Sequence, residues 1–285
     1  MNKTQELINR INELQFPGVV GLDPSLKVVP KEMEYWLTTE KYVNENLFSF
    51  CKNIIDAIHD IVPAVKPNIA FFERYLAYDA FHKVCQYAKS KGLFVIADIK
   101  REDIGTTAEA YADAYLTKDY IDFVTLSPYV GTDNLKPFLN KAIEFNKGIF
   151  ALVKTSNSSA SEFQDLLVDG KPLFEYVADK VVEWNNYCRD TEGFGRVGAV
   201  VGCTHPTQAT ELRKKYPNVF FLVPGYGTQG GTAEDAKVNF INGVGGIVNS
   251  SSAILGAHKK SEEDFCTATR NAVLKMKDDL NICLT

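Results

Sequence analysis

Residues 94–107 read FVIADIKREDIGTT, an apolar run that gives way at Asp98 to a cluster of charged residues. Four apolar residues in a row after Lys91-Gly92 are typical of a strand covered on both faces, as in a parallel sheet. Side chains alternate along a strand, so Asp98 and Lys100 should point to the same side. An unpaired buried charge costs on the order of several kcal/mol. We therefore expect these charges to pair with each other or with a bound molecule.

Similar apolar runs recur along the chain, each ending in glycine, proline or polar residues and each followed by a helix-like stretch. The eight runs cover residues 18–22, 61–65, 93–97, 123–126, 149–153, 197–201, 219–223 and 244–248. The amphipathic stretches between them include 43–59, 76–90, 106–117, 173–187, 206–215, 231–241 and 261–279. Eight strands alternating with helices predict an α/β fold, a (β/α)8 TIM barrel that forms a single domain over residues 1–285. A doubly wound sheet is the alternative, but no Gly-x-Gly-x-x-Gly turn follows the first run.

Composition limits the classes of function. The formal net charge of -5 argues against a surface for nucleic acid or for an anionic membrane. Six cysteines stand far apart without a C-x-x-C pair, so they predict reduced thiols and a cytoplasmic protein. No segment approaches 18 uninterrupted apolar residues, so we expect no membrane span. Four scattered histidines and the isolated cysteines predict no metal site.

In a barrel, the polar residues just past each strand converge on one mouth. A single Asp or Lys at such a place is most simply a solvated strand end, but two lysines together with several carboxylates favour a catalytic site. The longest polar stretch after a strand, residues 155–170, is a candidate lid. The residues expected at the mouth are Asp23, Lys66, Asn68, Asp98, Lys100, Ser127, Ser156, Thr204, Gln229 and residues 249–252.

Residues 98–107, DIKREDIGTT, resemble the D-x-K-x-x-D-I-x-x-T signature of the orotidine 5′-monophosphate decarboxylase family. Four further stretches resemble the other family motifs in the same order: GLDP at 21–24, VKPN at 65–68, LVKTSN at 152–157 and PGYGTQGG at 224–231. Related sugar-phosphate barrels share D-x-K-x-x-D, so the extension by Ile104 and Thr107 and the glycine-rich turn give the match its specificity. The resemblance extends over essentially the whole chain and is to bacterial-type members of about this length.

The resemblance implies decarboxylation of orotidine 5′-monophosphate to UMP and CO2, the final step of de novo UMP biosynthesis, without a cofactor. It makes Lys100 the proton donor to C6 of the pyrimidine and places Asp98 beside the departing carboxylate. It also implies a homodimer in which Asp103 crosses the interface and joins the network of Lys66, Asp98 and Lys100 in the other subunit. Opposite charges beside an ammonium favour its charged form, so this network should keep Lys100 protonated.

The resemblance also assigns substrate contacts. Asp23 and Lys66 are implied to hold ribose hydroxyls, Ser156 to read the pyrimidine, and the loop from Pro224 to Gln229 to close over ring and phosphate. Ile104 and Thr107 are implied to reach the same substrate from the segment that crosses the interface.

The chain departs from the family at the phosphate. Family members usually read Asn-Ser-Ser-Arg where residues 249–252 read Asn-Ser-Ser-Ser, so Ser252 stands in place of the phosphate-binding arginine. We expect backbone N–H groups of Ser251 and Ser252, with Gln229, to hold the phosphate instead. Two alternatives stay open: a metal-dependent sugar-phosphate decarboxylase or synthase of the same barrel group, and a non-catalytic nucleotide-binding relative.

Overall fold

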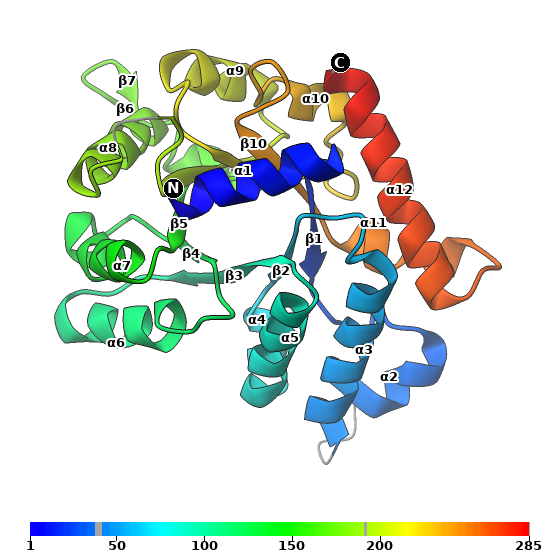
Figure 1. Cartoon of the computed structure of the whole chain (residues 1–285). Coiled ribbons are helices and arrows are strands. Elements are labelled where there is room, and N and C mark those ends of the chain that lie inside the picture. The colour runs from blue at the N-terminus through cyan, green and yellow to red at the C-terminus, as the bar shows by residue number, and fades with distance from the viewer. Residues whose placement is uncertain (38–41, 191–192, 285) are drawn as a thin grey trace.

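The structure is a computed structural model that describes residues 1–37, 42–190 and 193–284. Its core is a closed barrel of eight parallel strands in the order β1-β10-β9-β8-β5-β4-β3-β2 (Figure 1). The predicted (β/α)8 barrel is therefore confirmed. The barrel strands are β1 (Gly18–Leu22), β2 (Ala64–Pro67), β3 (Phe94–Arg101), β4 (Phe123–Leu126), β5 (Gly148–Lys154), β8 (Val197–Val201), β9 (Phe221–Val223) and β10 (Gly246–Ser250).

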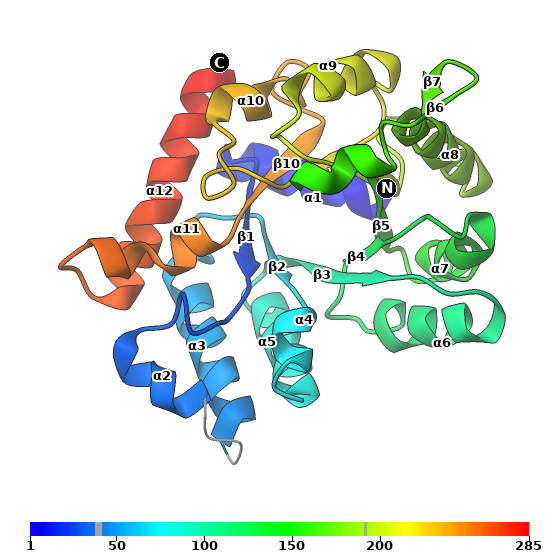
Figure 2. The same cartoon turned by 180° about the vertical axis from the view of Figure 1, so that it is seen from behind.

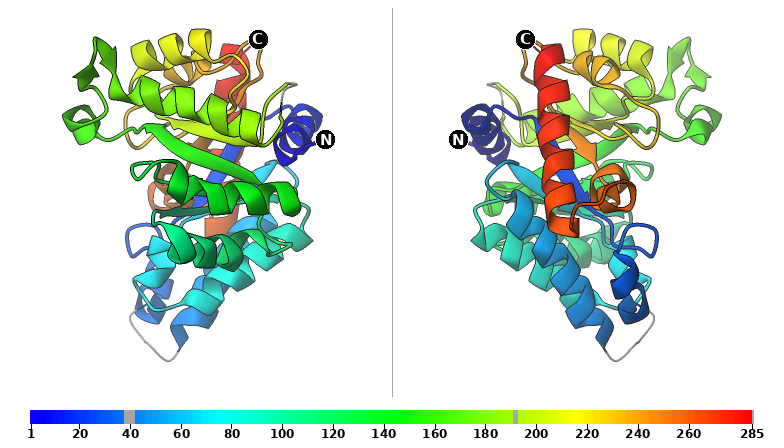
Figure 3. Two further views of the ribbon diagram at one scale, coloured as in Figure 1. Left: turned by 90° about the vertical axis from the view of Figure 1, so that its left-hand side faces the viewer. Right: turned by 90° about the vertical axis from the view of Figure 1, so that its right-hand side faces the viewer.

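Helices surround the barrel (Figures 1 and 3). They are α1 (Lys3–Leu14), α2 (Lys31–Leu37), α3 (Val43–Ile58), α4 (Ala70–Glu73), α5 (Tyr78–Ser90), α6 (Gly105–Leu116), α7 (Thr132–Glu144), α8 (Leu173–Tyr187), α9 (Pro206–Lys215), α10 (Ala233–Lys237), α11 (Ser252–Leu255) and α12 (Phe265–Leu284). Two 3-10 helices, η2 (Ser158–Glu162) and η3 (Ala257–Lys260), and the antiparallel pair β6 (Leu167–Val168) and β7 (Lys171–Pro172) complete the described fold. Within those ranges, no helix has the length and apolar character needed to cross a membrane.

Several strand boundaries differ from the predicted ones, at the closed end where strands begin and at the mouth where they end. Strand β2 begins at Ala64 rather than residue 61, because the Ile61 N–H bonds back to the Ile58 carbonyl at 2.9 Å and prolongs the turn that ends α3. Strand β3 continues to Arg101, and β10 runs to Ser250. The charged residues Lys66, Asp98 and Lys100 thus lie within strands and not in the loops that follow them.

The helix predictions succeed best where a helix packs along the barrel. Helices α8 and α9 have the predicted bounds, whereas α12 begins at residue 265 and ends at 284. The stretch 231–241 forms only the short helix α10, which starts at a capping box between Thr232 and Asp235. Helix α7 was not predicted and carries Pro137 in its sequence.

Helix α1 closes the end of the barrel where the strands begin (Figure 1), and the two side views show it at one edge of the molecule (Figure 3). Its apolar face of Leu7, Ile8 and Ile11 belongs to one buried cluster with Phe220, which precedes β9, and with side chains of the barrel strands, including Val19, Ala64, Ile96, Phe123, Phe150, Leu222 and Ile247. This end is therefore a solid core. The opposite end, seen from behind in Figure 2, collects the carboxyl ends of the strands and forms the mouth.

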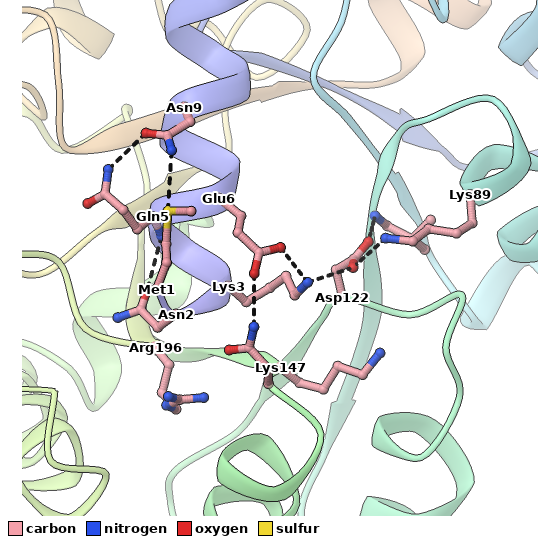
Figure 4. A network of polar contacts seen from close by, with 12 residues as sticks. Met1, Asn2, Lys3, Gln5, Glu6, Asn9, Lys89, Asp122, Lys147 and Arg196 are labelled. Carbon is pink, nitrogen blue, oxygen red and sulfur yellow. Dashed lines mark hydrogen bonds and ion pairs between the residues drawn. The ribbon is translucent and has the colours of Figure 1, made fainter.

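A polar network joins α1 to the closed end (Figure 4). Asp122, directly before β4, accepts from Lys89 Nζ at 2.6 Å and from the Val95 N–H at 3.0 Å, and Lys3 Nζ lies 3.8 Å away. Asn2 caps α1 with its side-chain oxygen and donates its amide to the Phe194 carbonyl at 2.9 Å. These contacts tie the start of the chain to segments more than 100 residues away.

Candidate active site

Asp98 is the centre of the charged cluster at the mouth. It lies on β3, is 4% exposed, and binds one lysine with each carboxylate oxygen. Lys66 Nζ, from the neighbouring strand β2, donates to Oδ2 at 2.6 Å, and Lys100 Nζ donates to Oδ1. The predicted pairing of Asp98 with Lys100 on one side of the strand is therefore observed, with Lys66 as a second partner.

The cluster holds its charges at neutral pH. Burial raises the pKa of Asp98, but the ammonium groups of Lys66 and Lys100 outweigh it and hold that pKa well below its ordinary value. Burial likewise lowers the pKa of Lys66, and the negative charges of Asp98 and Asp23 reverse this and raise it. A carboxylate with a lowered pKa beside an ammonium with a raised one remains an ion pair over the physiological range.

Thr125 is a member of the cluster that the sequence analysis missed. It lies buried on β4, donates its hydroxyl to Asp98 Oδ1 at 2.8 Å and accepts the N–H groups of Ile99 and Lys100. Its one sequence signal is a polar residue in the apolar run Phe123–Leu126. A threonine is common inside strands, so that signal alone has no functional meaning.

The ends of β1 and β10 bring together polar atoms that have no partner. Asp23 follows β1 directly, and its Oδ1 is buried without a hydrogen bond, as are Asn249 Oδ1 and Ser251 Oγ. A Cβ placed on Gly21 would lie 2.8 Å from Ser251 Cβ and 3.2 Å from Asn249 Oδ1, so these groups are close neighbours. Buried polar atoms are normally hydrogen-bonded, and a cluster of unpaired ones suits a bound polar molecule.

The loop after β9 is a compact turn at the same mouth. The Gly227 N–H bonds to the Gly231 carbonyl at 2.9 Å, and Gly225 has a φ of 104°, which a residue with a side chain rarely adopts. Gln229 is exposed at the tip. Ser252 Oγ donates to Thr228 Oγ1 at 2.9 Å, so the loop is attached to the start of α11.

Ser156 and Pro224 lie where the ends of β5, β8 and β9 meet. A Cβ on Gly202 would be 2.8 Å from Ser156 Cα, and the Thr204 hydroxyl donates to the Ser156 carbonyl at 2.9 Å. The Pro224 carbonyl accepts the Cys203 N–H at 2.9 Å. Ser156 is thus held by backbone packing at the rim of the mouth.

The segment after β3 has no hydrogen bond or ion pair to the charged cluster within the described residues. Asp103 Oδ1 accepts the Ile104 N–H at 2.8 Å, and within the described residues Asp103 has no ion-pair partner. Ile104 is 57% exposed, and Thr107 is exposed on the first turn of α6. The structure therefore does not bring these three residues together with Lys66, Asp98 and Lys100 of the same chain.

The candidate lid, residues 155–170, is folded rather than open chain. It contains η2 and the first strand of the β6–β7 pair, and it is anchored by a 2.6 Å ion pair between the fully buried Lys154 and Asp165. Gln164 Nε2 donates to Thr155 Oγ1 at 2.7 Å, and Gln164 Oε1 accepts the Thr155 backbone N–H at 2.9 Å. Its role as a lid stays a prediction.

No cluster of three or more His, Cys, Asp or Glu side chains with the geometry of a metal site occurs in the part of the chain that the structure describes. The four histidines are dispersed over the fold. His82 contacts Tyr120, and His258 packs against Phe265, so both have neighbours within the helical layer.

A parallel barrel with a lysine–carboxylate cluster at its mouth defines a barrel enzyme with a charged active site. The chain belongs to the Orotidine 5'-phosphate decarboxylase / HUMPS family, whose model matches residues 19–263. This confirms the resemblance inferred from the sequence motifs.

Individual relatives agree over the full length. The orotidine 5'-phosphate decarboxylase of Caldicellulosiruptor bescii is 40% identical over 305 aligned positions that cover 100% of both chains. That of Rhodopirellula baltica is 43% identical over 280 positions, covering 92% of this chain and 93% of the other. The solved structure of Leishmania donovani OMP decarboxylase matches with a TM-score of 0.80 at 28% identity, covering 100% of this chain and 99% of that one.

Proposed function

We propose that this protein decarboxylates orotidine 5′-monophosphate to UMP and CO2, the final step of de novo pyrimidine biosynthesis. The observation that carries the proposal is the buried carboxylate of Asp98 between the ammonium groups of Lys66 and Lys100. The full-length relatives named above support the choice of this reaction over the sugar-phosphate reactions of related barrels. We assign it to one domain over residues 1–285, of which 38–41, 191–192 and 285 lie outside the described residues.

Loss of CO2 from a ring carbon leaves a carbanion at C6. A fixed ammonium beside that carbon stabilises the developing charge and then supplies the proton, which suits Lys100 as the general acid. The Lys100 side chain is 48% exposed and is tethered to Asp98 at its tip, so its ammonium is both accessible and positioned. Asp98, at the other end of this contact, would lie beside the departing carboxylate. No cofactor is needed for this chemistry.

Unused hydrogen-bond donors support a ligand at the cluster. An ammonium has three N–H donors, and Asp98 takes one from each lysine. Within the described residues, no other acceptor receives the remaining donors of Lys66, although its side chain is buried. Ribose hydroxyls could accept from Lys66 and donate to the unpartnered Asp23 Oδ1. The same argument assigns the Ser251 hydroxyl to the substrate.

The phosphate would lie between the β9 loop and the start of α11, held by Gln229 and by backbone N–H groups of Ser251 and Ser252. The nearest cations in sequence are Lys259 and Lys260. Lys259 Nζ already donates to the Leu26 carbonyl at 3.3 Å and lies 3.8 Å from Glu34. We propose that no cation takes the place of the family arginine at Ser252. We assign the pyrimidine to Ser156 and closure over the ring to the loop from Pro224.

We further propose a homodimer in which Asp103, Ile104 and Thr107 complete the site of the other subunit. Asp103 has no cationic partner within the described residues of its own chain. The loops after β3, β4 and β5 expose large apolar side chains on one side of the rim: Ile104, Tyr129, Val130, Phe163, Leu166 and Leu167. Exposed large apolar side chains on neighbouring loops are typical of an interface.

The proposed location is the cytoplasm. All six cysteines are free thiols, and five of them are buried. Burial raises the pKa of Cys188 and of Cys203 to about 12, so these thiols stay protonated and unreactive. This state suits a reducing compartment.

The test is loss of orotate absorbance after orotidine monophosphate is added to purified, EDTA-treated protein. We expect turnover that survives exhaustive chelation. Activity that disappears with chelation and returns with a divalent metal would support the metal-dependent alternative. Tight UMP binding without turnover would support the non-catalytic alternative, and either result would contradict the proposal.

A further inference from the structure

The Thr125 hydroxyl lies at the junction of three groups of the charged cluster. Its Oγ1 is 3.0 Å from the Ile99 nitrogen, 3.1 Å from the Lys100 nitrogen and 2.8 Å from Asp98 Oδ1. Thr125 belongs to β4, whereas the other three residues belong to β3. One side chain from a neighbouring strand therefore contacts both the backbone and the acidic side chain of the cluster.

The chemistry of a hydroxyl determines the direction of each of these bonds. A threonine hydroxyl has one donor and two acceptor lone pairs. The N–H groups of Ile99 and Lys100 can only donate, so they occupy both lone pairs. The single O–H must then donate to the Asp98 carboxylate. All three capacities of the hydroxyl are used, and none can be reassigned without leaving a buried group unpaired.

The backbone that Thr125 holds is irregular. Lys100 has a φ of 44°, in the left-handed region that residues with side chains rarely occupy. The register between β3 and β4 shifts between Ala97 and Arg101, so regular ladder bonds do not support Lys100 at this point. An unfavourable conformation of this kind persists only where its surroundings impose it. The bonds from Ile99 and Lys100 to Thr125 hold this backbone directly at the irregular position.

We infer that Thr125 is a positioning residue for the decarboxylation, whose hydroxyl fixes where the Lys100 ammonium lies. It acts at both ends of Lys100: it holds the backbone N–H directly, and it orients Asp98, to which the ammonium is bound. The inference rests on the proposed role of Lys100 as general acid. Thr125 does not itself touch the substrate in this proposal.

The experiment compares Thr125→Val with Thr125→Ser. Valine keeps the shape and removes all three hydrogen bonds, whereas serine keeps the hydroxyl. A displacement of about 1 Å in a reacting group costs roughly 100-fold in rate, so we expect kcat of Thr125→Val to fall by about that factor. KM should change less than about threefold, because the ribose and phosphate contacts lie on other strands. Thr125→Ser should restore kcat to within about fivefold of the wild type.

Thr269→Val is the matched control. Thr269 is fully buried on α12 and its hydroxyl has no partner, so valine there changes a buried threonine far from the mouth. We expect wild-type kcat and KM. If Thr125→Val does not fold, Thr125→Cys replaces it, since a thiol has similar volume and hydrogen-bonds only weakly.

Three results would overturn the inference: a folded Thr125→Val with wild-type kcat, an equal loss in Thr125→Ser, or an equal loss in Thr269→Val. Lys100→Ala measured in the same assay separates the two proposals. If Lys100→Ala keeps its turnover, the proposed function of Lys100 fails. If Lys100→Ala is inactive while Thr125→Val is normal, only the role of Thr125 fails.

Discussion

The two ends of the barrel each contain a buried aspartate surrounded by lysines, yet they differ in what is left unpaired. Asp98 at the mouth is 4% exposed and Asp122 at the closed end is 1% exposed. Each carboxylate binds a lysine at 2.6 Å, Lys66 at the mouth and Lys89 at the closed end. Burial and ion pairing alone do not distinguish the two clusters.

The Asp98 and Asp122 clusters do differ in whether their remaining polar groups have hydrogen-bond partners. At the closed end, Lys147 Nζ donates to the carbonyls of Lys118 and Ile121, and Lys3 pairs with Glu6 on α1 (Figure 4). Burial lowers the pKa of Lys147, and the nearby charge of Asp122 only partly offsets this. At the mouth, Lys66 Nζ donates to Asp98 alone among the described residues, and Asp23 Oδ1 has no hydrogen-bond partner there. We therefore interpret the cluster completed by backbone groups as structural, and the one with unpaired groups as the proposed binding site.

The largest expected effect separates a lysine of the mouth from one of the closed end. Lys100→Ala removes the proposed general acid and should lower kcat by roughly 10²–10⁴-fold or more while the protein stays folded. Lys89→Ala removes the matching partner of Asp122 and should keep wild-type kcat. The rate at which orotate absorbance is lost, measured for both variants, gives the two kcat values. Lys100→Ala retaining more than about a hundredth of the rate would mean that another group supplies the proton.

The second prediction tests the proposal that Asp103 completes the site of the other subunit. Asp103→Ala and Lys100→Ala should each be inactive, but mixing them under conditions that exchange subunits should restore about a quarter of the sites. Heterodimers then carry one site with both residues intact. Activity after mixing and subunit exchange, followed by native mass spectrometry, are the measurements. Exchange without recovery would place Asp103 in the site of its own subunit.

The third prediction concerns the two aspartates themselves. Asp122→Asn should lower the free energy of unfolding by about 1–3 kcal/mol, because Lys89 and the Val95 N–H lose a charged partner. Its kcat should be unchanged at temperatures where it is folded. Asp98→Asn should instead abolish turnover. Urea unfolding and the orotate assay on both variants give the comparison, and a loss of kcat in folded Asp122→Asn would remove the distinction between the two ends.

The smallest effect is expected at Ser252, on the phosphate side of the mouth. A charge-assisted bond to phosphate contributes roughly 1.5–3 kcal/mol, so Ser252→Arg should lower KM for orotidine monophosphate about tenfold or more. Turnover of a substrate without phosphate should hardly change. Ser252→Gln is a control of similar length without charge. An unchanged or raised KM in folded Ser252→Arg would indicate that another cation already fills this space.

Much of the mouth could be predicted because its residues form local patterns. Apolar runs mark the eight strands, and the charges that interrupt one of them mark Asp98 and Lys100. The strand ends were placed too early because a charged residue reads as the start of a loop, whereas here ion pairing keeps Lys66 and Asp98 inside strands. The roles of Asp103 and Ser252 remain predictions.

The roles of Asp122 at the closed end and of Thr125 at the mouth could not be predicted from the sequence, for a different reason. Asp122 and Thr125 are important because of hydrogen bonds to residues on other strands. A single sequence does not show which hydrogen-bonding groups will lie next to them. Thr125 contacts β3 residues that lie 25 to 27 positions earlier in the chain. Such contacts appear only once strand register is known.

The attachment of α1 has a consequence for the order of folding during synthesis. Asn2 bonds to the Phe194 carbonyl across 192 residues, so α1 cannot make this contact until a much later segment of the chain has been synthesised. At ordinary translation rates of about 5–20 residues per second, that delay is roughly 10–40 s. A helix of this length is barely stable alone in water, so its apolar face would remain unprotected during that time. The closed end of the barrel therefore forms late in synthesis, when the segments that pack against α1 have all been made.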